Sequence, residues 1–154
     1  MVQLGDHFPS REKREFIETS LKPGCVIRIP VIFPEITKPK FLVLVAADNP
    51  DFLTFIINSE INPFIENRPH LFQCQVKLDV NNHDFLQHDS YAACHQVWPI
   101  RKEDVVQALL ADMSRFKGEI SNDVRSLIVA AVTSAKTIDR DKKVRIISEL
   151  EKST

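Results

Sequence analysis

Residues 41–58, FLVLVAADNPDFLTFIIN, contain the pattern that decides the fold of this chain. The first seven residues are a continuous apolar run of strand length, which is typical of a strand buried on both faces. Asp48-Asn49-Pro50-Asp51 is a strong turn signal, and residues 52–58 form a second apolar run behind it. The sequence therefore predicts a β-hairpin whose first strand has no solvent-facing side.

Further strands are predicted on both sides of this hairpin. Residues 25–33 are rich in β-branched side chains, with Pro30 restricting them to an edge or a bulge. Residues 72–78 alternate between apolar and polar, and residues 92–100 form the last strand. About five strands joined by short turns, without crossover helices, predict a small antiparallel barrel or sandwich.

Helical patterns flank the strands. A short N-terminal helix is expected over residues 10–21, and helices follow over residues 103–113, from Ser121 onward and at the C-terminal end. The α+β chain is therefore expected to be one domain over residues 1–154, with a β-barrel core over 23–100. Residues 101–154 are expected to form a helical C-terminal extension packed on that barrel.

Composition narrows the classes of function. The chain has 20 basic and 21 acidic side chains in 154 residues, which argues against a dedicated binder of double-stranded nucleic acid but permits a local basic groove. Three glycines are too few for a glycine-rich phosphate loop. No apolar run is long enough for a bilayer, and the N-terminus lacks a signal-peptide pattern, so a cytoplasmic location without membrane contact is expected. The cysteines Cys25, Cys74 and Cys94 are expected to be buried free thiols.

The order of short motifs resembles the PemK/MazF family of bacterial toxins over roughly residues 23–136. Gly24-Cys25-Val26-Ile27 opens the first strand, Lys38-Pro39-Lys40 precedes the second, and Ile56-Ile57-Asn58-Ser59 ends the third. Later elements match residues 72–78, Asp89-Ser90-Tyr91 and Lys117-Gly118-Glu119-Ile120-Ser121. A helix over residues 103–113 departs from the family pattern, which continues there with sheet.

The resemblance implies an SH3-like barrel that cleaves single-stranded RNA without a metal or other cofactor, as part of a toxin–antitoxin system. It implies a homodimer and a cognate antitoxin protein as partners. The family's two catalytic positions, a basic residue before the second strand and a Ser or Thr after the third, correspond to Lys38 or Lys40 and to Ser59. The basic position is normally arginine, whose planar guanidinium grips a phosphate with two hydrogen bonds, whereas lysine acts as a point charge.

A polar cluster over residues 81–95 supplies further candidates. RNA cleavage through the 2′-hydroxyl needs a base and an acid, and histidine suits both roles. His88, next to Asp89, would serve if its loop folds over Ser59; a solvated loop with aspartate turns explains the same residues. A zinc site of His83, His88, Cys94 and His95 is disfavoured because the spacings match no recurring zinc pattern, so no metal site is expected.

Four residues are candidates for RNA binding outside the catalytic set. Arg68, His70 and Arg101 add positive charge at loop ends, and Trp98 would stack on a base. Solvated surface charge and a tryptophan that fills the core or an interface explain them equally well. Likewise, Lys38-Pro39-Lys40 is either a phosphate-facing segment or an ordinary solvated turn.

Three functions follow from these patterns. The first is a toxin-like, metal-independent endoribonuclease acting on single-stranded RNA. The second is a catalytically degenerate barrel of the same fold that binds a protein or RNA, which the missing arginine favours because a fold alone does not carry an activity. The third is an interaction domain without any role in nucleic-acid binding.

Overall fold

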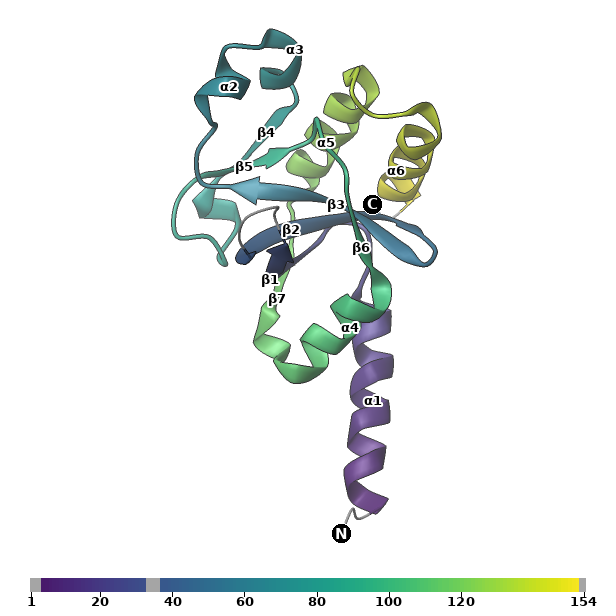
Figure 1. Cartoon of the computed structure of the whole chain (residues 1–154). Helices are drawn as coiled ribbons and strands as arrows, with labels where there is room; N and C mark the ends of the chain where they lie inside the picture. The colour runs from purple at the N-terminus through teal and green to yellow at the C-terminus, as the bar shows by residue number, and fades with distance from the viewer. Residues whose placement is uncertain (1–3, 33–36, 153–154) are drawn as a thin grey trace.

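A computed structural model describes residues 4–32 and 37–152 of the chain (Figure 1). Within these residues lie six α-helices: α1 (Leu4–Ser20), α2 (Pro63–Glu66), α3 (Pro69–Phe72), α4 (Lys102–Ala111), α5 (Asn122–Ser134) and α6 (Arg140–Lys152). The same residues form seven strands: β1 (Cys25–Ile32), β2 (Thr37–Asp48), β3 (Asp51–Asn58), β4 (Gln75–Leu78), β5 (Ser90–Ala93), β6 (Trp98–Arg101) and β7 (Phe116–Glu119). The α+β class expected from the sequence is confirmed.

The strands form a single antiparallel sheet built on the predicted hairpin. Its order is β4-β5-β3-β2-β1-β7, with β6 pairing with the first half of β3 and β5 with its end. In the part of the chain that the structure describes, no ladder joins β4 to β7, so the sheet is open. The closed SH3-like barrel of five strands is therefore not what these residues form, because helices cover both faces of the sheet instead of the sheet curling onto itself.

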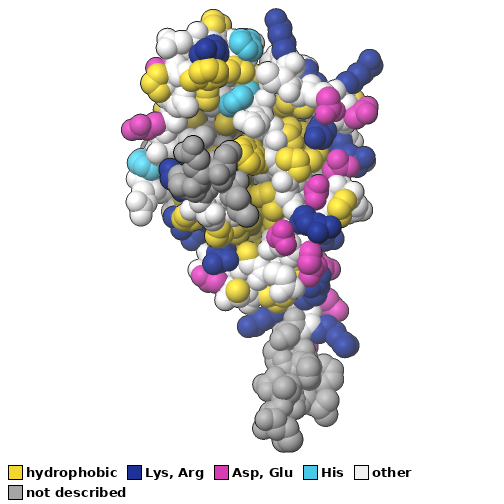
Figure 2. All heavy atoms as spheres, in the orientation of Figure 1, with side chains coloured by type: hydrophobic (Ala, Val, Ile, Leu, Met, Phe, Trp, Pro, Cys, Tyr) yellow, Lys and Arg dark blue, Asp and Glu magenta, His cyan; other side chains and the backbone are white. Residues whose placement is uncertain are grey.

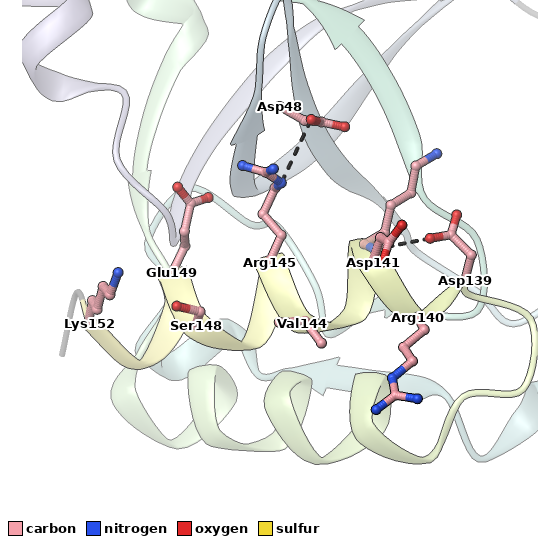
Figure 3. A pocket seen from close by; sticks show the side chains of 10 residues that line it. Asp48, Asp139, Arg140, Asp141, Val144, Arg145, Ser148, Glu149 and Lys152 are labelled. Carbon is pink, nitrogen blue, oxygen red and sulfur yellow. Dashed lines mark hydrogen bonds and ion pairs between the residues drawn. The ribbon is translucent and has the colours of Figure 1, made fainter.

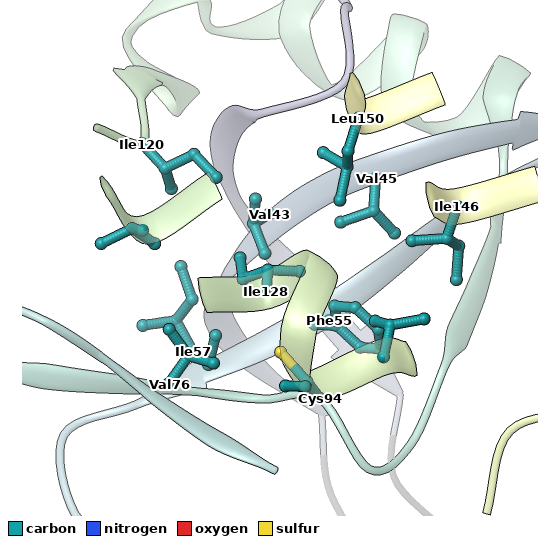
Figure 4. Close-up of a cluster of buried hydrophobic side chains, with 14 of the residues drawn as sticks. Val43, Val45, Phe55, Ile57, Val76, Cys94, Ile120, Ile128, Ile146 and Leu150 are labelled. Carbon is teal, nitrogen blue, oxygen red and sulfur yellow. The ribbon is translucent and has the colours of Figure 1, made fainter. Parts of the chain in front are cut away.

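The β2–β3 hairpin separates two hydrophobic cores. Val43 and Val45 of β2 pack in one core with side chains of α5 and α6, such as Ile128 and Ile146 (Figure 4). The alternate residues of β2, such as Leu42, pack in a second core with α1 and α4. Both sets are almost fully buried, which confirms that this strand has no solvent-facing side. Figure 1 shows α1 projecting away from the sheet beyond α4.

Several sequence expectations need correction. Residues 92–100 do not form one strand: the chain turns after β5 and returns as β6, so the two segments pair with opposite ends of β3. Residues 72–74 belong to α3 and a turn instead of a strand. The lysine segment expected as a loop is the start of β2, where Lys38 pairs with Val31 and Pro39 with Pro30 of β1. Phe33, the last residue of the expected strand 25–33, and residues 34–36 of the expected loop lie outside the described residues.

The sequence predicts the presence of the helices better than it predicts where the strands begin and end. Ser121 caps α5 by accepting the backbone N–H of Val124 at 3.2 Å, as predicted. In contrast, β7 lies within the region expected to be helical and pairs with β1. The division into a core over 23–100 and an extension over 101–154 remains a prediction, although one strand of the sheet comes from the second part.

We predict that Gly24→Ala destabilises the protein by about 1–2 kcal/mol or more. Gly24 has a φ of +99°, and a Cβ there would lie 2.3 Å from Nη2 of Arg125. Arg125 is buried and donates to the carbonyl of Pro23 at 3.2 Å, so its guanidinium has little room to move. Urea unfolding measures the loss. The exposed neighbour Lys22→Ala is the control, and equal stability of the two variants would contradict the prediction.

Candidate nucleic-acid interface

One groove of about 530 Å³ brings together three of the four residues predicted to be catalytic. Lys40, Ser59 and His88 all line it, whereas Lys38 does not. We call it the cationic groove, and its lining is Arg28, Pro39, Lys40, Phe41, Ile57, Ser59, Phe85, Leu86, Gln87, His88, Ser90 and Lys117. It lies where strands β1, β2, β3 and β7 meet the loop between β4 and β5.

The register of the sheet explains how residues far apart in sequence reach this groove. Arg28 of β1 is paired with Phe41 of β2, which in turn is paired with Ile57 of β3. Directly paired residues lie on the same face of an antiparallel sheet, so these three side chains form a row across it. The guanidinium of Arg28 lies over the ring of Phe41, 5.6 Å from its centroid. Ser59 directly follows the end of β3, two residues along the chain from Ile57.

Lys40 lies at the rim of the groove. It precedes Phe41 and so belongs to the alternate face of β2. Its ammonium donates a 2.8 Å hydrogen bond to Oδ1 of Asn58, its cross-strand neighbour. Burial lowers the pKa of Lys40, and the charge of nearby Lys38 lowers it further. Lys40 is therefore a stronger acid than an ordinary lysine, and Lys38 is close enough to contribute to the potential of the groove.

The opposite wall is the loop of residues 79–89, which His83 fixes. His83 is buried, with Nδ1 2.8 Å from the carbonyl oxygen of Asp79 and Nε2 accepting the backbone N–H of Ser121 at 3.2 Å. The carbonyl requires a proton on Nδ1 and the N–H requires a lone pair on Nε2, so one neutral tautomer fits both partners. His83 thus ties the loop to the start of α5.

Asp89 and Ser90 complete the support of this loop. Oδ1 of Asp89 accepts the N–H of Val80 at 2.9 Å, and Oδ2 lies 3.4 Å from Nζ of Lys77. The backbone hydrogen bond lowers the pKa of Asp89, and Lys77 lowers it further. Ser90 donates to the carbonyl of His88 at 3.2 Å. Asp89 therefore holds the loop in shape, and the exposed His88 is positioned through its backbone.

Charge distinguishes this groove from a larger one on α6. Among the described residues, the cationic groove is lined by Arg28, Lys40, Lys117 and His88 and by no carboxylate. The α6 groove, of about 770 Å³, has four acidic and four basic residues, with Arg145 of α6 3.7 Å from Asp48 (Figure 3). Figure 2 shows acidic and basic side chains interspersed on the α6 side of the molecule. Only the first of these two grooves presents a field of one sign, as a polyanion requires.

The four residues predicted to bind RNA lie outside the cationic groove. Cζ of the Arg68 guanidinium lies 3.4 Å from the ring centroid of Phe64, and Nη1 of Arg68 donates a hydrogen bond to the backbone carbonyl of Phe64. His70 is exposed on α3. Trp98 and Arg101 lie in β6, where the half-buried Trp98 packs against the second core and its carbonyl accepts the hydroxyl of Thr54 at 2.7 Å. Their roles in RNA binding remain predictions.

Sequence reasoning missed three groove residues, Arg28, Phe85 and Lys117. A signal for Arg28 was present, because it is the one charge in the otherwise apolar segment CVIRIPVI. Its neighbours Ile27 and Ile29 are buried, so a strand pattern would place Arg28 on the other face. Lys117 had no such signal, since β7 lies between helices.

The three cysteines are buried, and His95, one of the zinc candidates, has a side-chain partner. Cys25, Cys74 and Cys94 are free thiols in buried positions, and burial raises the pKa of each. Nδ1 of His95 lies 3.0 Å from Nε2 of Gln75, and burial lowers the pKa of His95. Over residues 4–32 and 37–152, no three His, Cys, Asp or Glu side chains gather in a group that could hold a metal ion.

Comparisons with known proteins give similarity of shape and none of sequence. No family model matches the chain, and no curated protein matches it. Among solved structures, it is similar to the Mycobacterium tuberculosis toxin MazF-mt6, with a TM-score of 0.48 and 13% sequence identity over 77% of this chain and 99% of the toxin. None of the described helices is both long and apolar enough to cross a bilayer.

We predict that His83→Leu destabilises the protein by about 2 kcal/mol or more, because it leaves two buried backbone groups without partners. The loop of residues 79–89 should then exchange its amide hydrogens faster, which hydrogen-exchange mass spectrometry measures. His88→Leu in the same loop is the matched control, since its side chain is exposed. Equal exchange in the two variants would show that His83 does not hold the loop.

Proposed function

We propose that this protein is a toxin-like, metal-independent endoribonuclease that acts on single-stranded RNA as part of a toxin–antitoxin system. One observation carries the proposal: three of the predicted catalytic residues line a groove whose charged side chains, over the described part of the chain, are all basic. A phosphodiester backbone carries a negative charge at each step, so such a groove attracts it even though the whole chain has a net charge of −1.

The proposed reaction is attack of the RNA 2′-hydroxyl on the adjacent phosphate. A base takes the proton of that hydroxyl, an acid protonates the leaving 5′-oxygen, and the products are a 2′,3′-cyclic phosphate and a 5′-hydroxyl. His88 is the proposed base. Lys40 is the proposed acid, since its lowered pKa favours proton release. Ser59 donates a hydrogen bond to a phosphate oxygen.

Arg28 supplies the guanidinium group that the segment Lys38-Pro39-Lys40 lacks. Negative charge grows on the phosphate oxygens as the 2′-oxygen attacks, and a fixed guanidinium stabilises that charge. Packing of Arg28 over Phe41 limits its rotamers, so less freedom is lost when it binds phosphate. Lys117, within the lining, would hold a further phosphate, and Lys38, outside the lining, would add long-range attraction.

A non-catalytic RNA-binding protein is the second candidate. The hydrogen bond between Lys40 and Asn58 favours it, because an ammonium already engaged at 2.8 Å must leave that partner before it reaches a phosphate. Both candidates predict RNA in the cationic groove, and only cleavage separates them.

We predict that the purified protein cleaves mixed-sequence single-stranded RNA in EDTA and leaves cyclic phosphate ends. Arg28→Ala should lower the cleavage rate by roughly 10²–10³-fold, the usual effect of removing a group that stabilises the transition state. Lys40→Ala, Ser59→Ala and His88→Ala should each lower it as well. Denaturing gels of end-labelled RNA measure the rates.

Two controls make this test specific. Arg140→Ala removes an exposed arginine on α6, far from the groove lining, and should retain the wild-type rate. RNA with 2′-O-methyl groups should resist cleavage, since it lacks the attacking hydroxyl. Binding without cleavage by the wild type would reject the nuclease and support the RNA-binding protein, whereas absence of both would reject both candidates.

The proposal includes two protein partners, a cognate antitoxin and a second copy of this chain. Phe52 and Phe55 of β3 are buried and offer no apolar surface to a second copy. Exposed apolar side chains lie instead on helices, including Phe64 of α2 and Phe72 of α3. We expect a dimer in sedimentation equilibrium at micromolar concentration. A monomeric mass would contradict the dimer.

A further inference from the structure

Phe85 is held in one place on the wall of the cationic groove. Its ring centroid lies 6.0 Å from that of Phe41 and 5.8 Å from that of His83, which meets it edge-on. Gly118 of β7 is the third neighbour. It has no side chain, and a Cβ added to it would lie 3.5 Å from Cδ1 of Phe85, so the ring lies close to the backbone of β7. Phe85 is nonetheless only half-buried, and it lines the groove.

Anchoring of the loop does not require this aromatic ring. The next residue, Leu86, is 6% exposed and packs in the core between the sheet and α5, while His83 holds the loop from the other side. A ring that is fixed by three neighbours and partly open to a basic groove is instead suited to binding a flat partner.

We propose that Phe85 stacks on an unpaired nucleobase while Arg28 and Lys117 hold the neighbouring phosphates. This inference rests on the proposed RNA-binding role of the groove and adds the residue that recognises an unstacked base. The two aromatic rings among the described residues of the groove differ in availability, because the guanidinium of Arg28 lies over the ring of Phe41. Phe85 is therefore the ring left for a base.

Stacking on Phe85 gives the groove a preference for single strands. A base in a duplex is already stacked on both faces, so it reaches a protein ring only after leaving the helix. Every base has a π-face, so the contact favours unpaired nucleotides of any sequence. Charge alone, by contrast, would attract single and double strands alike.

A double-mutant cycle between protein and nucleic acid tests this stacking. The probes are 2′-O-methyl oligonucleotides of about eight nucleotides, within the usual size of single-strand sites. One is intact and the other has abasic residues with the same number of phosphates. We expect the wild type to bind the intact strand roughly 5- to 100-fold more tightly than the abasic one, the range that stacking on one aromatic residue supplies. Phe85→Leu should remove most of that ratio and leave binding of the abasic strand nearly unchanged.

Two further variants guard against a trivial loss of structure. Phe72→Leu makes the same change at an exposed phenylalanine outside the groove and should keep the wild-type ratio. Phe85→Trp retains an aromatic face at this position, so the ratio of intact to abasic binding should stay the same or rise. If Phe85→Leu does not fold, Phe85→Trp and Phe85→Met replace it. Stacking is then supported if Phe85→Trp keeps the binding ratio and Phe85→Met loses it, and it is overturned if Phe85→Met keeps the ratio.

The results separate this inference from the nuclease. An unchanged ratio in Phe85→Leu, or equal weakening of both strands, overturns stacking even if the wild type cleaves RNA. A ratio that depends on Phe85 in a protein that does not cleave RNA supports stacking and overturns the nuclease. Failure of the wild type to bind the intact strand overturns both.

Discussion

Burial of both faces of β2 is the constraint on which the rest of the structure depends. Successive side chains of a strand point to opposite faces, so the alternating pairs Leu42 with Leu44 and Val43 with Val45 need two separate apolar layers. Helices α5 and α6 supply one layer, and α1 and α4 supply the other. A sheet covered on both faces has no need to close on itself, which explains why the chain forms an open sheet where a barrel was expected.

The same constraint creates the groove. Burial of β2 begins near Phe41, and residues 37–39 before it are exposed. The helices therefore cover the sheet only up to that point, and the row of Arg28, Phe41 and Ile57 lies at the margin of the covered area. The loop of residues 79–89 closes the other side, held by His83 and Asp89. Basic side chains reach this margin from three strands because it is the place where the sheet is open to water.

The central hairpin was predictable from sequence because its apolar runs are continuous and its turn residues are distinctive. The α5 cap at Ser121 was predictable for a similar reason, since capping is a local interaction. β7 was not predictable, because residues 116–119 are too short and mixed to form a pattern and gain their strand conformation from pairing with β1. Arg28 had a local signal, as the one charge in an apolar strand, but its pairing with Phe41 depends on strand register, which local sequence does not encode.

The net charge of the chain argues against a dedicated binder of double-stranded nucleic acid, whereas the charge of the groove favours nucleic-acid binding. The two agree once the distance over which each charge acts is considered. A net charge of −1 describes the long-range field, which screening reduces over about 10 Å at 0.1 M salt. Arg28, Lys40 and Lys117 line one groove, and no carboxylate stands among the described residues of that lining. Acidic side chains elsewhere, such as those interspersed on α6, offset the total without weakening the local attraction. The proposed RNA-binding role therefore implies contact with a few phosphates of a flexible strand and little gain from a long duplex, because the positive charge lies in one small groove.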